Sequence, residues 1–238
     1  MPPPPDRPED PALPGQWPHR ARPLFTPAAT TLFRVAILGG LLFLTGLGVT
    51  VYGFYHSPYW DDIGIAPPQP VLFSHRHHVG ELGIDCRNCH SGVETSAFAG
   101  LPPTQTCLSC HSQIFTTTSL LKPVVDSAVS NSPLVWTRVT RLPDHVYFNH
   151  SIHVNKGVGC TSCHGDIAHM AVTAKGEPMS MRWCLDCHKN PGPQLRPRSE
   201  EFSGNLPAGP ADPAKAAALL AFYQIHPGHL TDCSTCHH

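Results

Sequence analysis

The sequence predicts a mostly irregular chain with short α-helices, packed around covalently attached cofactors and preceded by one transmembrane α-helix. Three observations lead to this fold class. The motif C-x-x-C-H occurs five times, the chain has 27 prolines and 19 glycines in 238 residues, and an uncharged apolar run of helical length stands near the N-terminus. A chain so rich in breakers of regular structure cannot build a large core from its own side chains. The fold class that combines these features is a multihaem cytochrome c.

The five motifs use all 10 cysteines of the chain. They are Cys86/Cys89/His90, Cys107/Cys110/His111, Cys160/Cys163/His164, Cys184/Cys187/His188 and Cys233/Cys236/His237. This spacing lets two thiols add to the vinyl groups of a haem while the next residue offers its imidazole to the iron. Zinc ribbons and dithiol redox motifs also use C-x-x-C, but they do not explain a histidine after every pair. We expect five covalently bound haem c groups.

The N-terminal part predicts a membrane anchor. Residues 1–30 contain ten prolines and predict a cytoplasmic tail without regular structure. Residues 31–56 predict a transmembrane helix, because Val35 to Phe54 is free of charge and would span roughly 30 Å. A cleaved signal peptide is the alternative, but such apolar regions are usually shorter and end in an A-x-A-like site. Arginines before the run and Asp61 and Asp62 after it indicate a cytoplasmic N-terminus and a haem domain on the periplasmic side of the inner membrane.

An internal duplication organises the rest of the chain. Phe73-x-His75-x-x-His78 precedes Cys86, and Phe148-x-His150-x-x-His153 precedes Cys160. Each unit then reaches a second motif, so the pattern predicts tandem dihaem modules followed by one further haem. The expected divisions are residues 57–112 (first module), 113–145 (connecting segment), 146–192 (second module) and 193–238 (C-terminal segment with the fifth haem). Within the last segment, Asp212 and Pro213 predict the start of a helix.

The paired histidines are the candidate second ligands of the irons. Two histidines three apart on a helical turn share one face, and their tips diverge enough to serve two irons. The pattern F-x-H-x-x-H followed by C-x-x-C-H resembles the small multihaem cytochromes of the c3 and c7 type. That resemblance implies that His75 and His150 ligate the haem attached just downstream, while His78 and His153 reach other haems. His77 breaks the matched spacing and is a weaker candidate.

Four distal histidines leave one iron without an assigned ligand. Met181, three residues before Cys184, is the preferred candidate, and its alternative role is packing against a macrocycle. A thioether ligand raises the reduction potential of a haem relative to two imidazoles. His226, His229 and His169 remain open as alternatives, and His145 is a weaker one.

Longer segments carry a more specific resemblance. GVETSAFAGLPPTQTCLSCHSQI, SPLVWTRVTRLPDHVYFNHSIHV and MSMRWCLDCHKNP resemble the pentahaem c-type cytochrome of alternative complex III. The resemblance implies an electron-transfer component without a catalytic site of its own, in a quinol oxidoreductase of a respiratory or photosynthetic chain. The partners that it implies are an iron-sulfur, molybdoenzyme-like subunit, polytopic quinol-binding subunits, and a monohaem cytochrome c, copper protein or terminal oxidase as acceptor.

Two other functions remain open. One is a self-sufficient, membrane-anchored quinol dehydrogenase that feeds a periplasmic reductase, although its first haem would follow the membrane span more closely than Cys86 does. The other is a multihaem redox enzyme, which needs an iron with an open coordination position. A nucleic-acid partner is not expected, because the formal net charge is only -1.

Overall fold

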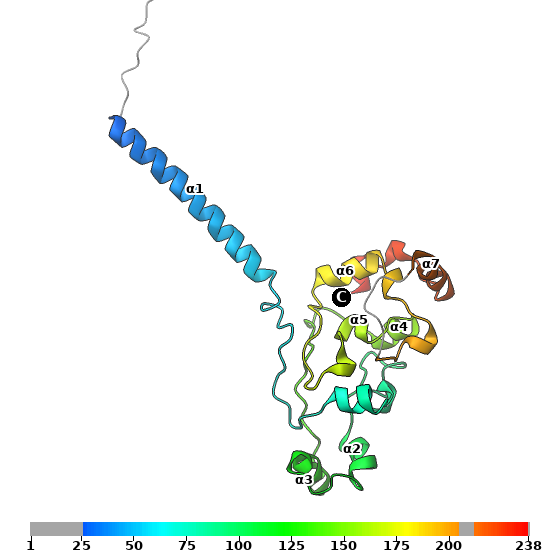
Figure 1. Ribbon diagram of the computed structural model, residues 1–238. Coiled ribbons are helices and arrows are strands. Elements are labelled where there is room, and N and C mark those ends of the chain that lie inside the picture. Colours follow the sequence, from blue (N-terminus) through cyan, green and yellow to red (C-terminus); the bar gives the residue numbers. More distant parts are fainter. Residues whose placement is uncertain (1–25, 205–211, 238) are drawn as a thin grey trace, which may run out of the picture. The chain divides into compact units, whose positions relative to one another are not determined.

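The structure is a computed structural model that describes residues 26–204 and 212–237 (Figure 1). The chain divides into two compact units, Met1–Tyr55 and His56–His238. Most of the predicted proline-rich tail, residues 1–25, lies outside the described residues. In the described part no residues form a named β-strand, and only two isolated antiparallel bridges occur, Val146 with His237 and Val158 with Leu195.

The first unit contains the helix α1, Pro27–Tyr55. Thr26 precedes it, and its hydroxyl oxygen accepts a hydrogen bond from the backbone N of Ala29 (3.3 Å), as expected at a helix N-terminus. The helix has 29 residues, none of them buried, and is roughly 44 Å long. It is long and apolar enough to cross a membrane. The predicted span, 31–56, lies almost entirely within this helix.

The second unit consists of short helices joined by irregular segments, as the sequence predicts. Its α-helices are α2 (Thr104–His111), α3 (Lys122–Ser130), α4 (His150–Asn155), α5 (Thr161–His164), α6 (Met181–Lys189) and α7 (Pro213–Phe222). Its single π-helical turn in the described part is η1 (Arg76–Glu81). The 3-10 turns are η2 (Cys86–Asn88), η3 (Ser119–Leu121), η4 (Ile167–His169), η5 (Gly192–Gln194), η6 (Arg198–Glu200), η7 (Pro227–His229) and η8 (Cys233–Thr235).

Helix α7 begins where the sequence predicts. The Asp212 carboxylate accepts a hydrogen bond from the backbone N of Ala214 (3.1 Å), and Pro213 is the first helical residue. The buried face of α7 packs Leu219, together with Tyr223 just after the helix, against Leu195. This small cluster ties α7 to the segment that follows α6.

Buried apolar side chains are few among the described residues. They are Val71, Val93, Val124, Val154, Ala168, Leu195, Ala216, Leu219 and Tyr223. Only Tyr223 among them is aromatic, so these side chains remove little apolar surface from water. The composition predicts this result, and it leaves the bound cofactors as the expected source of most of the interior.

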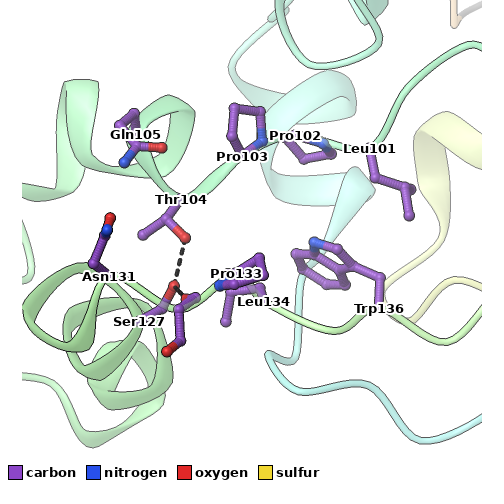
Figure 2. A pocket seen from close by; sticks show the side chains of 11 residues that line it. Leu101, Pro102, Pro103, Thr104, Gln105, Ser127, Asn131, Pro133, Leu134 and Trp136 are labelled. Carbon is purple, nitrogen blue, oxygen red and sulfur yellow. Dashed lines mark hydrogen bonds between the residues drawn. The ribbon is translucent and has the colours of Figure 1, made fainter.

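The segment predicted to connect the two modules contains η3 and α3, and α3 packs against α2 (Figure 1). The buried hydroxyl groups of Thr104 and Ser127 join the two helices by a hydrogen bond of 2.6 Å. A cavity of about 460 Å³ lies beside this contact and is lined in part by Pro103, Leu134 and Trp136 (Figure 2). None of its lining residues is a cysteine or histidine, so it is not one of the haem sites predicted from the motifs.

Candidate functional site

The five motifs are numbered as sites in chain order. Site 1 is Cys86, Cys89 and His90; site 2 is Cys107, Cys110 and His111; site 3 is Cys160, Cys163 and His164; site 4 is Cys184, Cys187 and His188; site 5 is Cys233, Cys236 and His237. Sites 2 and 4 lie on the helices α2 and α6, and site 3 overlaps α5. Sites 1 and 5 begin on the 3-10 turns η2 and η8. In sites 1, 3 and 5 the backbone N of the histidine donates to the carbonyl oxygen of the first cysteine (2.9 Å in each), so the motif makes one turn.

The two F-x-H-x-x-H segments have the same side-chain arrangement. The Phe73 ring stacks on His78 (centroids 4.4 Å apart, planes at 24°) and meets His75 edge-on (4.9 Å, 88°). In the second unit Phe148 stacks on His153 (4.5 Å, 28°) and meets His150 edge-on (4.8 Å, 85°). Each phenylalanine therefore fixes the orientation of two imidazoles. The sequence revealed the repeated phenylalanine but not this role.

Three of the predicted distal histidines face the histidine of a motif. The ring centroids are 6.2 Å apart for His78 and His111, 6.4 Å for His150 and His164, and 6.1 Å for His153 and His188. An imidazole nitrogen binds a transition metal at about 2.0 Å and its ring centroid lies roughly 1 Å farther back, so two imidazoles on opposite sides of one metal have centroids about 6 Å apart. Each of the three pairs therefore has room for one iron between its two rings. This spacing fits the prediction that His78 and His153 ligate the irons of sites 2 and 4 and that His150 ligates that of site 3.

Hydrogen bonds at the other ring nitrogen orient most of these histidines. The Nδ1 atom donates to a backbone carbonyl oxygen in His78 (Ser74, 2.9 Å), His90 (Gly100, 2.7 Å), His111 (Ile114, 3.3 Å), His150 (Ala97, 2.9 Å), His153 (Asn149, 2.8 Å), His188 (Leu230, 2.8 Å) and His237 (His145, 3.2 Å). Such a bond places the proton on Nδ1 and leaves the Nε2 lone pair for a metal. The histidines therefore have the tautomer that haem iron requires.

His75 lies close to the histidines of sites 1 and 3. Its Nδ1 is 3.0 Å from the Thr173 hydroxyl. Burial, followed by the neighbouring imidazoles of His90, His78 and His164, lowers the pKa of His75 to about 4. Burial, followed by His150 and His90, likewise lowers the pKa of His164 to about 4. Both rings are neutral near pH 7, and only a neutral imidazole can bind a metal.

Site 5 differs from the others. The His237 ring packs against His145 with centroids 5.5 Å apart and planes at 20°. The Nδ1 atom of His237 donates to the backbone oxygen of His145. The two ring centroids are closer than in the three pairs above, and ligation of this iron by His145 stays an open alternative. Met181, the predicted ligand, is the first residue of α6 and is 64% exposed, so the fifth distal ligand stays a prediction.

Two of the alternative histidines have carboxylate partners. The Nδ1 atom of His169 is 2.6 Å from Asp166, and that of His229 is 3.3 Å from Asp232. His77, the weaker candidate in the first repeat, is 2.8 Å from Glu81. In residues 26–204 and 212–237, no three His, Cys, Asp or Glu side chains converge as ligands of one metal ion. A porphyrin iron needs only two protein ligands, so the pairs described above are sufficient for it.

A partly buried arginine beside site 3, Arg196, was not singled out in the sequence. The Arg196 Nε atom is buried and has no hydrogen-bond partner among the described residues. A Cβ atom on Gly159, the residue before Cys160, would lie 2.7 Å from this Nε, so glycine is needed for the close approach. A haem carries two propionates, and a guanidinium whose Nε–H has no partner is suited to bind one of them. The residues present therefore fit a haem at site 3 in charge as well as in ligand geometry.

Comparison with known proteins agrees with this geometry. No family model matches the sequence. Over 174 residues the chain is 31% identical to the protein named menaquinone reductase, multiheme cytochrome c subunit, of Nitratidesulfovibrio vulgaris (strain Hildenborough). The alignment covers 64% of this chain and 82% of that protein. The chain belongs to the family of this multihaem cytochrome c subunit. Covalently bound haem c is therefore the cofactor of this multihaem cytochrome, as the C-x-x-C-H motifs predict.

Proposed function

We propose that this cytochrome relays electrons between a membrane quinone oxidoreductase and a periplasmic redox partner, with five haem c groups attached at sites 1 to 5. When bound, the haem irons alternate between ferric and ferrous states and so carry electrons one at a time. The observation that carries the proposal is the set of opposed histidine rings, separated by 6.1 to 6.4 Å. Two fixed imidazoles saturate an iron, which favours electron transfer over substrate binding.

The side chains of the protein have three separate tasks in this relay. The cysteines tether each macrocycle, so that its position does not depend on the oxidation state of the iron. The Nδ1 hydrogen bonds, such as that from His150 to Ala97, hold the ligating nitrogens in place and increase their basicity. Arg196 offers its buried Nε to a propionate and thereby contributes to the reduction potential at site 3.

For the complex itself we propose alternative complex III, with α1 as a single span of the inner membrane, the N-terminus in the cytoplasm and the second unit in the periplasm. In that assembly electrons from quinol pass through the haems to a monohaem cytochrome c, a copper protein or a terminal oxidase. The partners would be polytopic quinol-binding subunits together with an iron-sulfur subunit of the molybdoenzyme type. The single apolar helix and the resemblance of the quoted segments support this assignment.

A second candidate has support from the comparison. The relative with 31% identity is named as part of a menaquinone reductase. In a complex of that kind electrons would travel in the opposite direction, from a periplasmic donor through the cytochrome to menaquinone. The ligand geometry is the same for both directions, since an outer-sphere relay is reversible.

Purification of the native complex tests the proposal. Membranes solubilised in mild detergent and captured through a C-terminal affinity tag should yield the cytochrome together with polytopic and iron-sulfur subunits, identified by mass spectrometry. Added menaquinol should then reduce the haems, and an added periplasmic cytochrome should reoxidise them. Reduction of menaquinone by a reduced periplasmic donor, without the quinol reaction, would select the second candidate. A cytochrome that is purified alone and oxidises quinol would instead support a self-sufficient quinol dehydrogenase.

A further inference from the structure

Within each module a single helical turn joins two sites. His75 neighbours His90 of site 1, and His78, on the same turn, faces His111 of site 2 at 6.2 Å. The thiols of Cys89 and Cys107 also lie close enough to interact. Site 1 and site 2 are therefore adjacent.

The second module repeats this junction. On α4, His150 faces His164 of site 3 at 6.4 Å, and His153 faces His188 of site 4 at 6.1 Å. The Cys163 side chain lies within interaction distance of those of Cys187 and Cys184. Sites 3 and 4 are thus also neighbours.

The two modules meet through site 1 and site 3, which are not consecutive in the sequence. The side chains of Cys86 and Cys160 lie within interaction distance of each other. Backbone contacts fix the same junction, because His150 N donates to the Ala97 oxygen (3.2 Å) and Ser151 N to the Ser96 oxygen (3.2 Å). The loop after site 1 therefore holds the first turn of α4.

Site 5 adjoins site 4. The Nδ1 atom of His188 donates to the backbone oxygen of Leu230 (2.8 Å), and α6 packs against η7 (Figure 1). The Cys184 and Cys236 thiols also interact. Cys110 in site 2 and Cys233 in site 5 are the two exposed cysteines, and the other eight are half-buried.

From these contacts we propose that the five sites form one unbranched row in the order 2, 1, 3, 4, 5, so that electrons enter and leave the cytochrome at sites 2 and 5. The inference rests on the proposed attachment of a haem at each site. Each step moves one electron from a reduced haem to its oxidised neighbour and makes or breaks no bond. The first site in the sequence is then internal, and the exposed Cys110 and Cys233 lie at the two ends.

Photoreduction from one end of the isolated holocytochrome tests this order. Val129, on α3, is 83% exposed, and α3 packs against α2, which carries site 2. In a Val129→Cys variant the added thiol is the one free thiol, because haems occupy the others, and it can carry a ruthenium polypyridyl photosensitiser. A second change, His75→Ala, opens the iron of site 1 to carbon monoxide, which keeps that iron ferrous and removes it from the relay.

With site 1 blocked in this way, repeated flashes should reduce the haem of site 2 alone, a fall of about fivefold from the yield without carbon monoxide. The matched control, His153→Ala, blocks site 4 and should leave sites 2, 1 and 3 reducible. Reduction of three or more further haems in the His75→Ala protein would overturn the proposed order. Mass measurement must first show that each variant retains five haems.

If His75→Ala loses haem, crystals of the unmodified holocytochrome provide a second test. Anomalous scattering at the iron edge should place the site 1 iron between those of sites 2 and 3. An iron of site 2 that lies next to that of site 3 or site 5 would overturn the order. Neither measurement involves quinone or partner subunits, so a failure here is distinct from a failure of the proposed function.

Discussion

The imidazole rings of His150 and His164 are parallel to within 1°, with centroids 6.4 Å apart. His150 lies ten positions before Cys160, and α4 and the turn at Gly157 fold this stretch back so that the His150 and His164 rings come together. Gly157 has φ +82°, and a Cβ atom there would lie 2.3 Å from the Tyr223 ring. The left-handed turn therefore requires glycine, and the packing of Tyr223 supports the geometry of site 3.

Replacing His150 by Ala should open the iron of site 3 to external ligands. Loss of the His150 imidazole removes the proposed distal ligand, while Cys160 and Cys163 still hold the haem. Carbon monoxide should then bind about one fifth of the reduced haem, measured by difference spectroscopy. In the matched control, His77→Ala, which removes a ring bonded to Glu81, no binding is expected. Five attached haems without carbon monoxide binding in His150→Ala would contradict the assignment.

Replacing Phe148 by Ala should disturb two irons at once. The Phe148 ring contacts both His150 and His153, and each aromatic contact contributes about 1 kcal/mol. We expect changed g values for the irons of sites 3 and 4 in electron paramagnetic resonance spectra, with the remaining signals unchanged. The control is Leu120→Ala, which shortens a side chain that is 63% exposed. A change confined to one iron would show that Phe148 does not orient both histidines.

Replacing Tyr223 by Phe should destabilise the second unit by about 1 to 3 kcal/mol. The Tyr223 hydroxyl lies 2.8 Å from the carboxylate of Glu201 and 2.7 Å from the backbone oxygen of Arg196. Glu201 is only 1% exposed, so the variant leaves a buried carboxylate without this donor. Denaturant unfolding of the holoprotein measures the loss, with Phe222→Leu as the control. Equal stability of Tyr223→Phe and the parent would show that the hydrogen bond contributes nothing.

Because of the same Tyr223 hydroxyl, we expect the stability of the protein to depend on pH in the alkaline range. Burial, then the hydrogen bond to Glu201, raises the pKa of Tyr223 from 10.0 to about 12. A group whose pKa is higher in the folded than in the unfolded state stabilises the protein fully at a pH below the unfolded-state pKa. That contribution falls as the pH rises from 10 through 12. The parent should therefore lose stability in this range more steeply than Tyr223→Phe. The measurement is the fraction unfolded at a fixed denaturant concentration as the pH is varied. Parallel pH profiles for the two proteins would exclude this explanation.

The ligand of the fifth iron can be identified spectroscopically. Met181 lies one helical turn before Cys184 on α6, and the Cys184 thiol interacts with Cys236 of site 5. If Met181 binds that iron, the oxidised protein should show a near-infrared thioether-to-iron band that is absent from Met181→Leu. The comparison variant is His226→Ala, which should keep the band. A parent spectrum without the band would remove Met181 as a ligand and favour a histidine.

The motifs and the repeat could be predicted from the sequence because their spacing follows from covalent chemistry. The attachment sites, the membrane helix and the helix at Pro213 depend on residues within a few positions of one another. The pairing of His153 with His188 could not be derived from spacing, since it depends on how the tertiary fold places α4 and α6. The carbonyl oxygens that accept hydrogen bonds from the histidine Nδ1 atoms could not be predicted either, because any backbone carbonyl can serve. Only the tertiary fold brings the Leu230 oxygen to His188. The junction of Cys86 with Cys160 joins residues from separate modules for the same reason.

The scarcity of buried apolar side chains also affects how the protein is made. Before its cofactors are attached, the second unit has little to collapse around beyond clusters such as that of Leu195, Leu219 and Tyr223. The newly made polypeptide should therefore stay open to the enzymes that attach haem, and each attachment should stabilise the next part of the fold. Compaction and haem delivery then become a single process, so a shortage of haem would leave a chain exposed to proteases.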